Sequence, residues 1–158
     1  MEISELMKKF TDVVGIDAIE PDDNGAYHFE IDGMVVSFAE RKDTRELLTV
    51  AEVGEPPPDG RELLYRTLLE SAFLGEGTDG AAFSIERGSG QVCLHRADPL
   101  DLMDLDRFRG MLERFVNVLE NWRRLVADFR ETAPGQAKSA AEDARAVRQS
   151  REDGFIRV

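Results

Sequence analysis

The sequence predicts an α+β fold, with helices packed on an antiparallel sheet in the order α-β-β-β-α-β-β-α. Two observations lead to this prediction. Stretches of strand-like composition follow one another through turns short enough to be hairpins, which join neighbouring strands in opposite directions. Three stretches with apolar residues at spacings of three and four, typical of helices, stand before, between and after these strands. The chain has 158 residues, enough for one domain with a substantial core.

The first predicted element is a short amphipathic helix from Ile3 to Val14. Apolar residues recur along it at helical spacing, and Gly15 is a suitable stop. A terminal helix this short is stabilised by packing rather than by its intrinsic propensity. It is therefore expected to lie against the rest of the domain.

Three strands are predicted next, over residues 27–31, 34–39 and 46–53. Asp32-Gly33 is the favoured two-residue hairpin turn between the first two strands. The second and third strands carry apolar residues on both faces, which predicts a sheet covered on both faces. Two explanations remain open: the helices wrap both faces, or a partner covers one of them.

A central helix is predicted after Pro56-Pro57-Pro58, which ends the preceding strand, with Asp59 as its N-cap. Its sequence is GRELLYRTLLESAFL, closed by a glycine-rich loop. The apolar residues fan over roughly 180°, wider than the roughly 100° stripe of a helix packed on one partner. Either the helix is sunk deep in a monomer core, or it packs on its own sheet and also contacts a second subunit. These residues are Leu64, Tyr65, Leu68, Leu69, Ala72 and Phe73.

A second hairpin, over residues 81–85 and 92–94, precedes a long final helix with Asp104 as its N-cap. Apolar residues repeat at alternating spacings of three and four from Leu105 to Phe129. An extra apolar row widens the stripe, which favours packing on a sheet over a coiled coil. The pattern stops near Thr132. Residues 1–131 are therefore predicted to form the domain, and residues 132–158 a polar extension, loosely helical or disordered, with Phe155 and Ile156 as its apolar feature.

Composition excludes several classes of partner. The net charge is −12 and the pI is about 4.6, so the surface is expected to repel nucleic acid and anionic membranes. Cys93 is the only cysteine, which rules out an internal disulfide. The N-terminus does not resemble a signal peptide, and no run approaches the roughly 20 apolar residues of a membrane span. A cytoplasmic location is expected.

No catalytic motif emerges from the sequence. His28 and His95 lie on predicted strands without further ligands at metal-binding spacing, and Cys93 is expected to be a buried apolar side chain. No glycine-rich loop has phosphate-binding spacing, and no nucleophile elbow is present. The prediction is a protein without enzymatic activity, metal or cofactor.

Four strings follow one another along the chain: DDNGAYHFEIDGMVVSF, LLTVAEVGEPP, LLYRTLLESAFLGEGTDGAAFSIERGSGQVCLHR and DPLDLMDLDRFRGMLERFVNVLENWRRL. In the serial order of these strings, and over about residues 3–130, the chain resembles the Tir chaperone (CesT-type) family, the small acidic class I chaperones of bacterial type III secretion. The resemblance implies a homodimeric α+β subunit without catalytic activity, which binds the non-globular N-terminal segment of a secreted effector and keeps it export-competent.

The resemblance also implies site residues. Dimers of the family form largely around the central helix and the strand after it, which implies an interface of Leu64, Leu68, Leu69, Ala72 and Phe83. Replacing Leu68 by glutamate is then expected to break the dimer. The first helix and first strands would bind the effector through apolar patches and a strand edge. The residues implied there are Leu6, Phe10, Val14, Phe29, Ile31, Val35 and Phe38.

Residues 132–158 extend beyond the usual end of these chaperones and could contact the effector or fold back onto the domain. An alternative function is a regulatory adaptor that binds a folded partner through the last helix and this extension.

Overall fold

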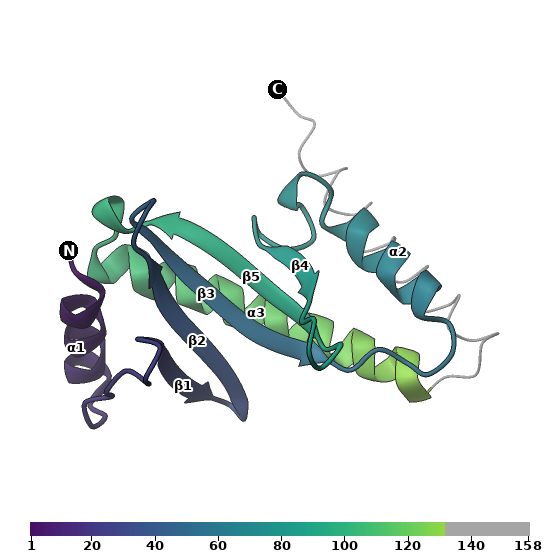
Figure 1. Ribbon diagram of the computed structural model, residues 1–158, viewed down its shortest axis with the longest axis horizontal. Helices are drawn as coiled ribbons and strands as arrows, with labels where there is room; N and C mark the ends of the chain where they lie inside the picture. Colours follow the sequence, from purple (N-terminus) through teal and green to yellow (C-terminus); the bar gives the residue numbers. More distant parts are fainter. Residues whose placement is uncertain (132–158) are drawn as a thin grey trace.

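The computed structural model describes residues 1–131, and its elements follow the predicted order (Figure 1). The predicted extension 132–158, with Phe155 and Ile156, lies outside the described residues. Two short 3₁₀ helices, η1 and η2, are added to the predicted elements. The bounds are α1 Ile3–Val14, β1 Tyr27–Ile31, β2 Met34–Arg41, β3 Glu46–Gly54, α2 Arg61–Ser71, η1 Phe73–Gly75, β4 Ala82–Ile85, β5 Val92–Pro99, η2 Leu100–Leu102 and α3 Leu105–Glu131.

The strands form one antiparallel sheet in the order β1-β2-β3-β5-β4. The first hairpin pairs Ile31 with Met34 across the predicted two-residue turn. The β3–β5 pairing joins the two hairpins, and β1 and β4 are left at the two edges. The predicted α+β fold with an antiparallel sheet is therefore confirmed.

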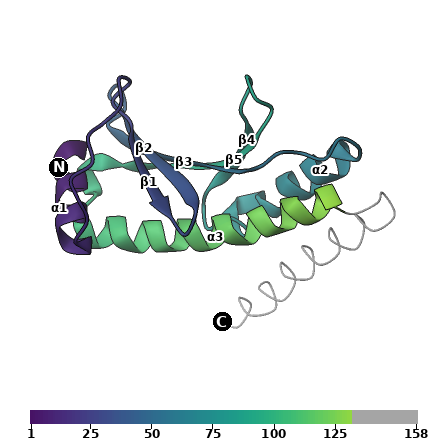
Figure 2. The same ribbon diagram turned by 90° about the horizontal axis from the view of Figure 1, so that it is seen from below.

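Helices α1 and α3 lie on one face of this sheet (Figure 2). Along the strands, buried residues alternate with residues of the opposite face, which no helix within residues 1–131 covers. On that open face the side chains of Val35 and Val50 are 53% and 38% exposed. Two explanations were open for the strands that carry apolar residues on both faces. The first, that helices cover both faces of the sheet, is wrong for the described part of the chain.

The core between α1, α3 and the sheet contains a cluster of four phenylalanine rings. Phe10 of α1 contacts Phe29 of β1 and Phe108 of α3, and Phe38 of β2 contacts the same two rings. Centroid separations are 5.1–5.6 Å, and all four contacts are edge-on. This geometry is the favourable one for aromatic pairs. The cluster ties both helices to the first hairpin.

The long helix α3 packs as its apolar repeat predicts, and its start is capped as expected. The backbone amide of Arg107 donates to Asp104 Oδ1 at 2.8 Å. The side chains that the repeat places on one face are buried, from Phe108 to Phe129. The apolar stripe of α3 is therefore buried against the sheet.

The central helix departs from its prediction at both ends. It begins after Gly60, whose φ of +80° is accessible to glycine, so Asp59 is not the N-cap and no side chain caps this end. It ends at Ser71, because the loop backbone turns back: the amide of Gly77 donates to the Ser71 carbonyl oxygen at 2.9 Å. Helix α2 is therefore shorter than the sequence pattern indicated.

Helices α1 and α2 lie at opposite ends of the molecule (Figure 1). The loop after α2 is held to α3 by Trp122, whose Nε1–H donates to the Gly77 carbonyl oxygen at 3.0 Å. The Trp122 ring also meets Phe83 of β4 edge-on, with centroids 5.0 Å apart. One end of the domain thus carries α1 and the other carries α2.

Candidate functional site

A surface groove of about 550 Å³ lies between α1, the end of β1 and the first half of α3. We call it the α1–α3 groove. Its apolar lining comes from Phe10 and Val14 of α1, Ile31 of β1, and Leu112 and Val116 of α3. Three of the seven side chains predicted to bind an effector, Phe10, Val14 and Ile31, therefore meet in one place.

The local sequence explains why the groove is open. Helix α1 buries Leu6, Met7 and Phe10, and it ends at Val14, because the next residue, Gly15, takes a left-handed φ of +74° and its amide caps the helix. Val14 lies in the last turn, beyond the packed part of the helix, and is 50% exposed. An exposed valine beside half-buried apolar side chains gives a surface that can accept an apolar side chain from outside.

Charged side chains border the groove on the α3 side. Asp106, Arg109 and Glu113 line it together with Gly110 and Asn117. A groove with an apolar floor and a charged rim on one helix suits a peptide that inserts apolar side chains and keeps its backbone at the surface.

The remaining predicted effector-binding residues lie elsewhere. Leu6, Phe29 and Phe38 are buried, at 0%, 3% and 0% exposure, so their placement on a binding surface is corrected: they are core residues. The spacing of apolar residues along the helix and the strands shows which residues share a face, but it does not show whether that face is covered or open. Val35 is exposed but belongs to the open face of the sheet.

The sequence prediction missed the contribution of α3 to this groove. Val116 is apolar but lies outside the repeat that packs on the sheet, and it is half-buried at the groove. An apolar residue outside the buried stripe of a helix was the signal that could have identified it.

The β1 strand adds a second binding feature next to the groove. It is an edge strand of the sheet, so one side of its backbone has no strand partner within the described residues. Ile31, its last residue, is at the groove. Edge strands can pair with an added peptide strand, and the side chains of that peptide then enter neighbouring pockets.

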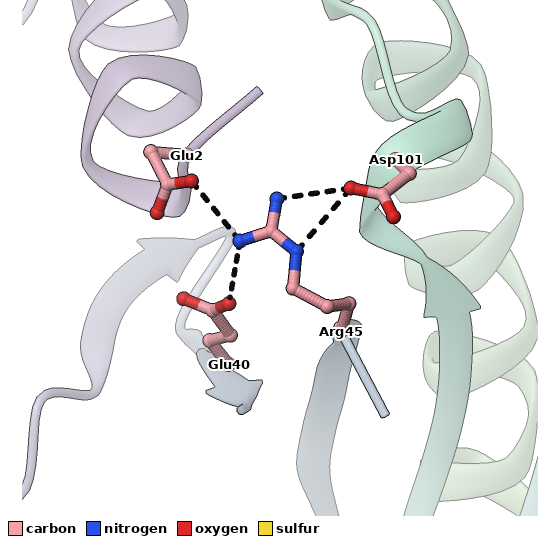
Figure 3. A network of polar contacts seen from close by, with 4 residues as sticks. All are labelled: Glu2, Glu40, Arg45 and Asp101. Atoms are coloured by element: carbon pink, nitrogen blue, oxygen red, sulfur yellow. Dashed lines mark hydrogen bonds and ion pairs between the residues drawn. The ribbon is translucent and has the colours of Figure 1, made fainter. Parts of the chain in front are cut away.

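Arg45, in the β2–β3 turn, holds the start of α1 in place (Figure 3). Its Nη1 lies 3.0 Å from Glu2 Oε1 and 3.2 Å from Glu40 Oε1, and its Nη2 lies 2.9 Å from Asp101 Oδ1. The hydrogen bonds to Asp101 and then to Glu2 raise the pKa of the guanidinium above its usual range. The network joins α1, β2 and η2 and so positions α1 beside the groove.

Replacing Arg45 by glutamine is expected to lower the midpoint of thermal unfolding, because three carboxylates lose their shared cation and repel one another. This decrease in the unfolding midpoint should be at least roughly twice the decrease caused by Arg66→Gln, since Arg66 forms an exposed ion pair within α2. It should shrink as NaCl is raised towards about 1 M, where charges are screened over about 3 Å. Equal shifts in both variants would show that the network does not hold α1.

A second exposed apolar surface lies at the other end of the molecule. We call it the α2 surface, defined by Leu69 of α2 and Phe73 and Leu74 of η1, which are 70%, 55% and 82% exposed. Leu74 also has a left-handed φ of +54°, which is unfavourable for leucine. Large apolar side chains grouped in solvent at a strained turn are typical of a contact surface.

The broad apolar arc of α2 is divided between two environments. Leu64 and Leu68 are 0% and 3% exposed and pack in the core of their own chain, whereas Leu69 faces solvent. Ala72 and Phe83 are half-buried. Leu64 and Leu68 therefore have almost no surface for a second subunit, and Leu68→Glu would test folding rather than dimerisation. Phe73 and Leu74, although exposed, were not among the interface residues that the sequence implied.

The histidines and the cysteine take local structural positions. His28 Nδ1 lies 2.8 Å from Ser37 Oγ, and its Nε2 lies 3.1 Å from Asp22 Oδ2. The pKa of Asp22 is lowered, first by the Ala26 amide and then by His28. Burial raises the pKa of the Cys93 thiol, with Glu52 and Glu86 adding to the effect. A search of residues 1–131 finds no group of three side chains suited to hold a metal ion.

Among the helices described here, none combines the length and the apolar character needed to cross a membrane.

Three solved structures with this fold are chains of protein complexes. A chain of the ExsC–ExsE complex superimposes with a TM-score of 0.68 at 19% identity, covering 80% of this chain and 97% of that one. A chain of the HopA1–SchA chaperone–effector complex gives 0.62 at 16% identity, covering 76% and 91%. The Yersinia pestis type III secretion chaperone SycH, in complex with a fragment of YscM2, gives 0.57 at 19% identity, covering 75% and 98%. At these identities the likeness shows the fold.

Two comparisons of sequence also give matches. A Chlamydia pneumoniae protein, CPj0713/CpB0740, is 29% identical over 122 residues, which cover 76% of this chain and 92% of that protein. The profile of the Tir chaperone protein (CesT) family matches residues 5–123, from α1 to the second half of α3. The chain therefore belongs to the Tir chaperone protein (CesT) family.

Proposed function

We propose that this protein is a non-catalytic type III secretion chaperone that binds the extended N-terminal segment of a secreted effector in the bacterial cytoplasm and keeps it export-competent. The observation that carries the proposal is the α1–α3 groove beside the free edge of β1, on a chain of this family. The structural neighbours support it, since they include chaperone–effector complexes.

The geometry suits an unfolded ligand. Backbone groups along the β1 edge can pair with an extended peptide, and the groove can accept its apolar side chains. Binding of this kind needs neither nucleotide nor metal. A segment held in this way is kept extended and is masked from aggregation.

We further propose that the working form is a homodimer joined through the α2 surface. Helices α1 and α2 lie at opposite ends of the subunit, so a dimer formed at α2 leaves both α1–α3 grooves open (Figure 1). The domain would comprise residues 1–131, and residues 132–158 would be an extension outside it.

The adaptor alternative loses support from the packing of α3. That alternative needed the apolar repeat of the last helix for a folded partner, but those side chains are buried against the sheet. The large exposed apolar residues of the described chain lie on α1 and in the loop after it, on the open sheet face, and on α2, η1, β4 and η2 instead.

The proposal is tested by co-purification of the tagged chain from its own cells, with and without residues 133–158, followed by mass determination of the complex. The expected result is a dimer holding one partner, which limited proteolysis shows to be bound through its N-terminal segment. A monomer, or a dimer that captures folded proteins only, would contradict the chaperone function.

Two matched valine variants locate the binding site. Val14→Asp places a charge in the α1–α3 groove and is expected to weaken effector binding by about ten- to a hundredfold, because an apolar contact is replaced by a desolvated carboxylate. Val35→Asp has the same chemistry at nearly the same exposure, 53% against 50%, but on the open sheet face. Titration calorimetry with the identified partner segment compares the two. A loss confined to Val35→Asp would move the site to the open sheet face.

A further inference from the structure

A second groove, of about 570 Å³, lies on the other side of α3, against η2 and the end of β5. We call it the η2–α3 groove. Its apolar lining includes Met103 and Met111, which are buried, and Leu102, which is 64% exposed. Methionine side chains adapt to different apolar ligands because they are flexible and polarisable. This groove therefore resembles the first in its capacity for an apolar side chain.

The two grooves share two residues, Asp106 and Gly110, which are one helical turn apart on α3. Between the grooves the helix presents these residues to solvent. Because Gly110 has no side chain, the ridge between the grooves is low at this position.

Nothing in the described chain requires glycine there. A glycine inside a helix is destabilising relative to alanine, because its backbone loses more conformational freedom on folding. A Cβ added at Gly110 would meet one neighbour within 4 Å, the Nη1 atom of Arg114 at 3.4 Å, which is the end of a flexible side chain. Its φ is not among the left-handed ones that favour glycine. A glycine without an internal reason at a groove boundary points to close approach by a ligand backbone.

The charges around the η2–α3 groove indicate what kind of ligand it would bind. Arg96, Arg107 and Arg114 line it together with Asp98 and Asp106, so arginines outnumber acidic residues here although the chain has a net charge of −12. Arg96 pairs with Asp98 at 2.6 Å and Arg114 with Asp79 at 2.9 Å.

Arg107 is the least neutralised of the three arginines. Its Nη1 donates to the Leu102 carbonyl oxygen at 2.7 Å, and it forms a long ion pair with Asp104, with Nε 3.8 Å from Oδ2. Its side chain is 63% exposed. This edge of the groove favours an acidic group on the ligand.

We propose that the two grooves form one binding track that crosses α3 at Gly110, and that its occupant is an extended segment of the secreted partner. One apolar side chain of this segment enters each groove, and an acidic residue lies beside Arg107 on the η2 side. The proposal rests on the proposed function and extends it across α3. A helix with its side chains is about 10–12 Å wide, and an extended chain advances about 3.3 Å per residue. The two apolar residues are therefore about three or four positions apart.

The test selects ligands from a random dodecapeptide library displayed on phage, with the purified full-length chain as bait. Enriched sequences are then synthesised with a fluorescent label, and their affinities are measured by polarisation. We expect two apolar residues three or four positions apart with Asp or Glu beside one of them. Gly110→Gln should weaken their binding by about tenfold or more. Ala127→Gln, a matched change at an exposed position of the same helix outside both grooves, should leave binding within about twofold.

Gly110→Ala separates binding from folding. Alanine should raise the midpoint of denaturation, because it favours the helix, while it weakens peptide binding. A variant that was merely less stable could not shift the two measurements in opposite directions.

The possible failures are distinguishable. If the selected peptides lose affinity for Val14→Asp but bind Gly110→Gln as they bind the unmodified chain, the track is wrong and the proposed function stands. If neither substitution changes the binding, or no peptide is enriched, both are contradicted.

Discussion

Replacing Phe108 by alanine is expected to destabilise the domain by about 3–5 kcal/mol, the usual cost of removing a buried aromatic side chain. Phe108 is 0% exposed, and its ring contacts those of Phe10 and Phe38 at centroid distances of 5.1 and 5.2 Å. The substitution opens a cavity where α1, the sheet and α3 meet. It is expected to loosen α1 and, with it, one wall of the α1–α3 groove.

The measurement is urea denaturation at one fixed protein concentration, because association of subunits would add to the apparent stability. Phe108→Leu, which fills most of the cavity, should lose less than half as much. Leu102→Ala, at a 64% exposed position, should change stability little. A small effect of Phe108→Ala would show that the aromatic cluster does not hold the helices to the sheet.

The second large effect is expected at the α2 surface. The double substitution of Leu69 and Phe73 by aspartate should convert the proposed dimer to a folded monomer, raising its dissociation constant by about a hundredfold or more. Two apolar side chains proposed to be buried between subunits would each become a charge that resists desolvation. Both positions are mostly exposed in the single chain, so its own core is left intact.

Sedimentation velocity over a range of concentrations measures the association, and circular dichroism reports whether the monomer remains folded. Leu102→Asp is the matched control, since Leu102 is a similarly exposed leucine on η2. It should sediment as the unmodified chain does. A double variant that remains dimeric would place the interface elsewhere.

Local pattern was enough to predict most of the elements. The start of α3 is determined by the short-range hydrogen bond to Asp104, and the first hairpin turn by the conformational preferences of Asp32 and Gly33. Glycine-rich sequence also predicted the end of α2, although the helix stops at Ser71, earlier than expected. That difference arises from a backbone hydrogen bond from Gly77, which depends on how the loop folds back.

The candidate site was predicted only in part, and the division has a physical cause. Periodicity identifies which residues share a face, but it does not say what that face contacts. Phe29, Phe38 and Val14 were all implied as binding residues without a basis for saying which of them face outward; Phe29 and Phe38 proved to be core, whereas Val14 is half exposed. The placement of Leu64 and Leu68 inward and Leu69 outward likewise depends on where α2 sits.

The sequence by itself determined the α+β class, the order of the elements and the amphipathic helices, because these depend on interactions between residues close in the chain. The tertiary structure alone decided that β5 pairs with β3, that no helix of residues 1–131 covers one face of the sheet, and that α1, β1 and α3 meet at a groove. These features depend on contacts between distant segments. No local pattern encodes such contacts, because each apolar face could be buried in more than one way.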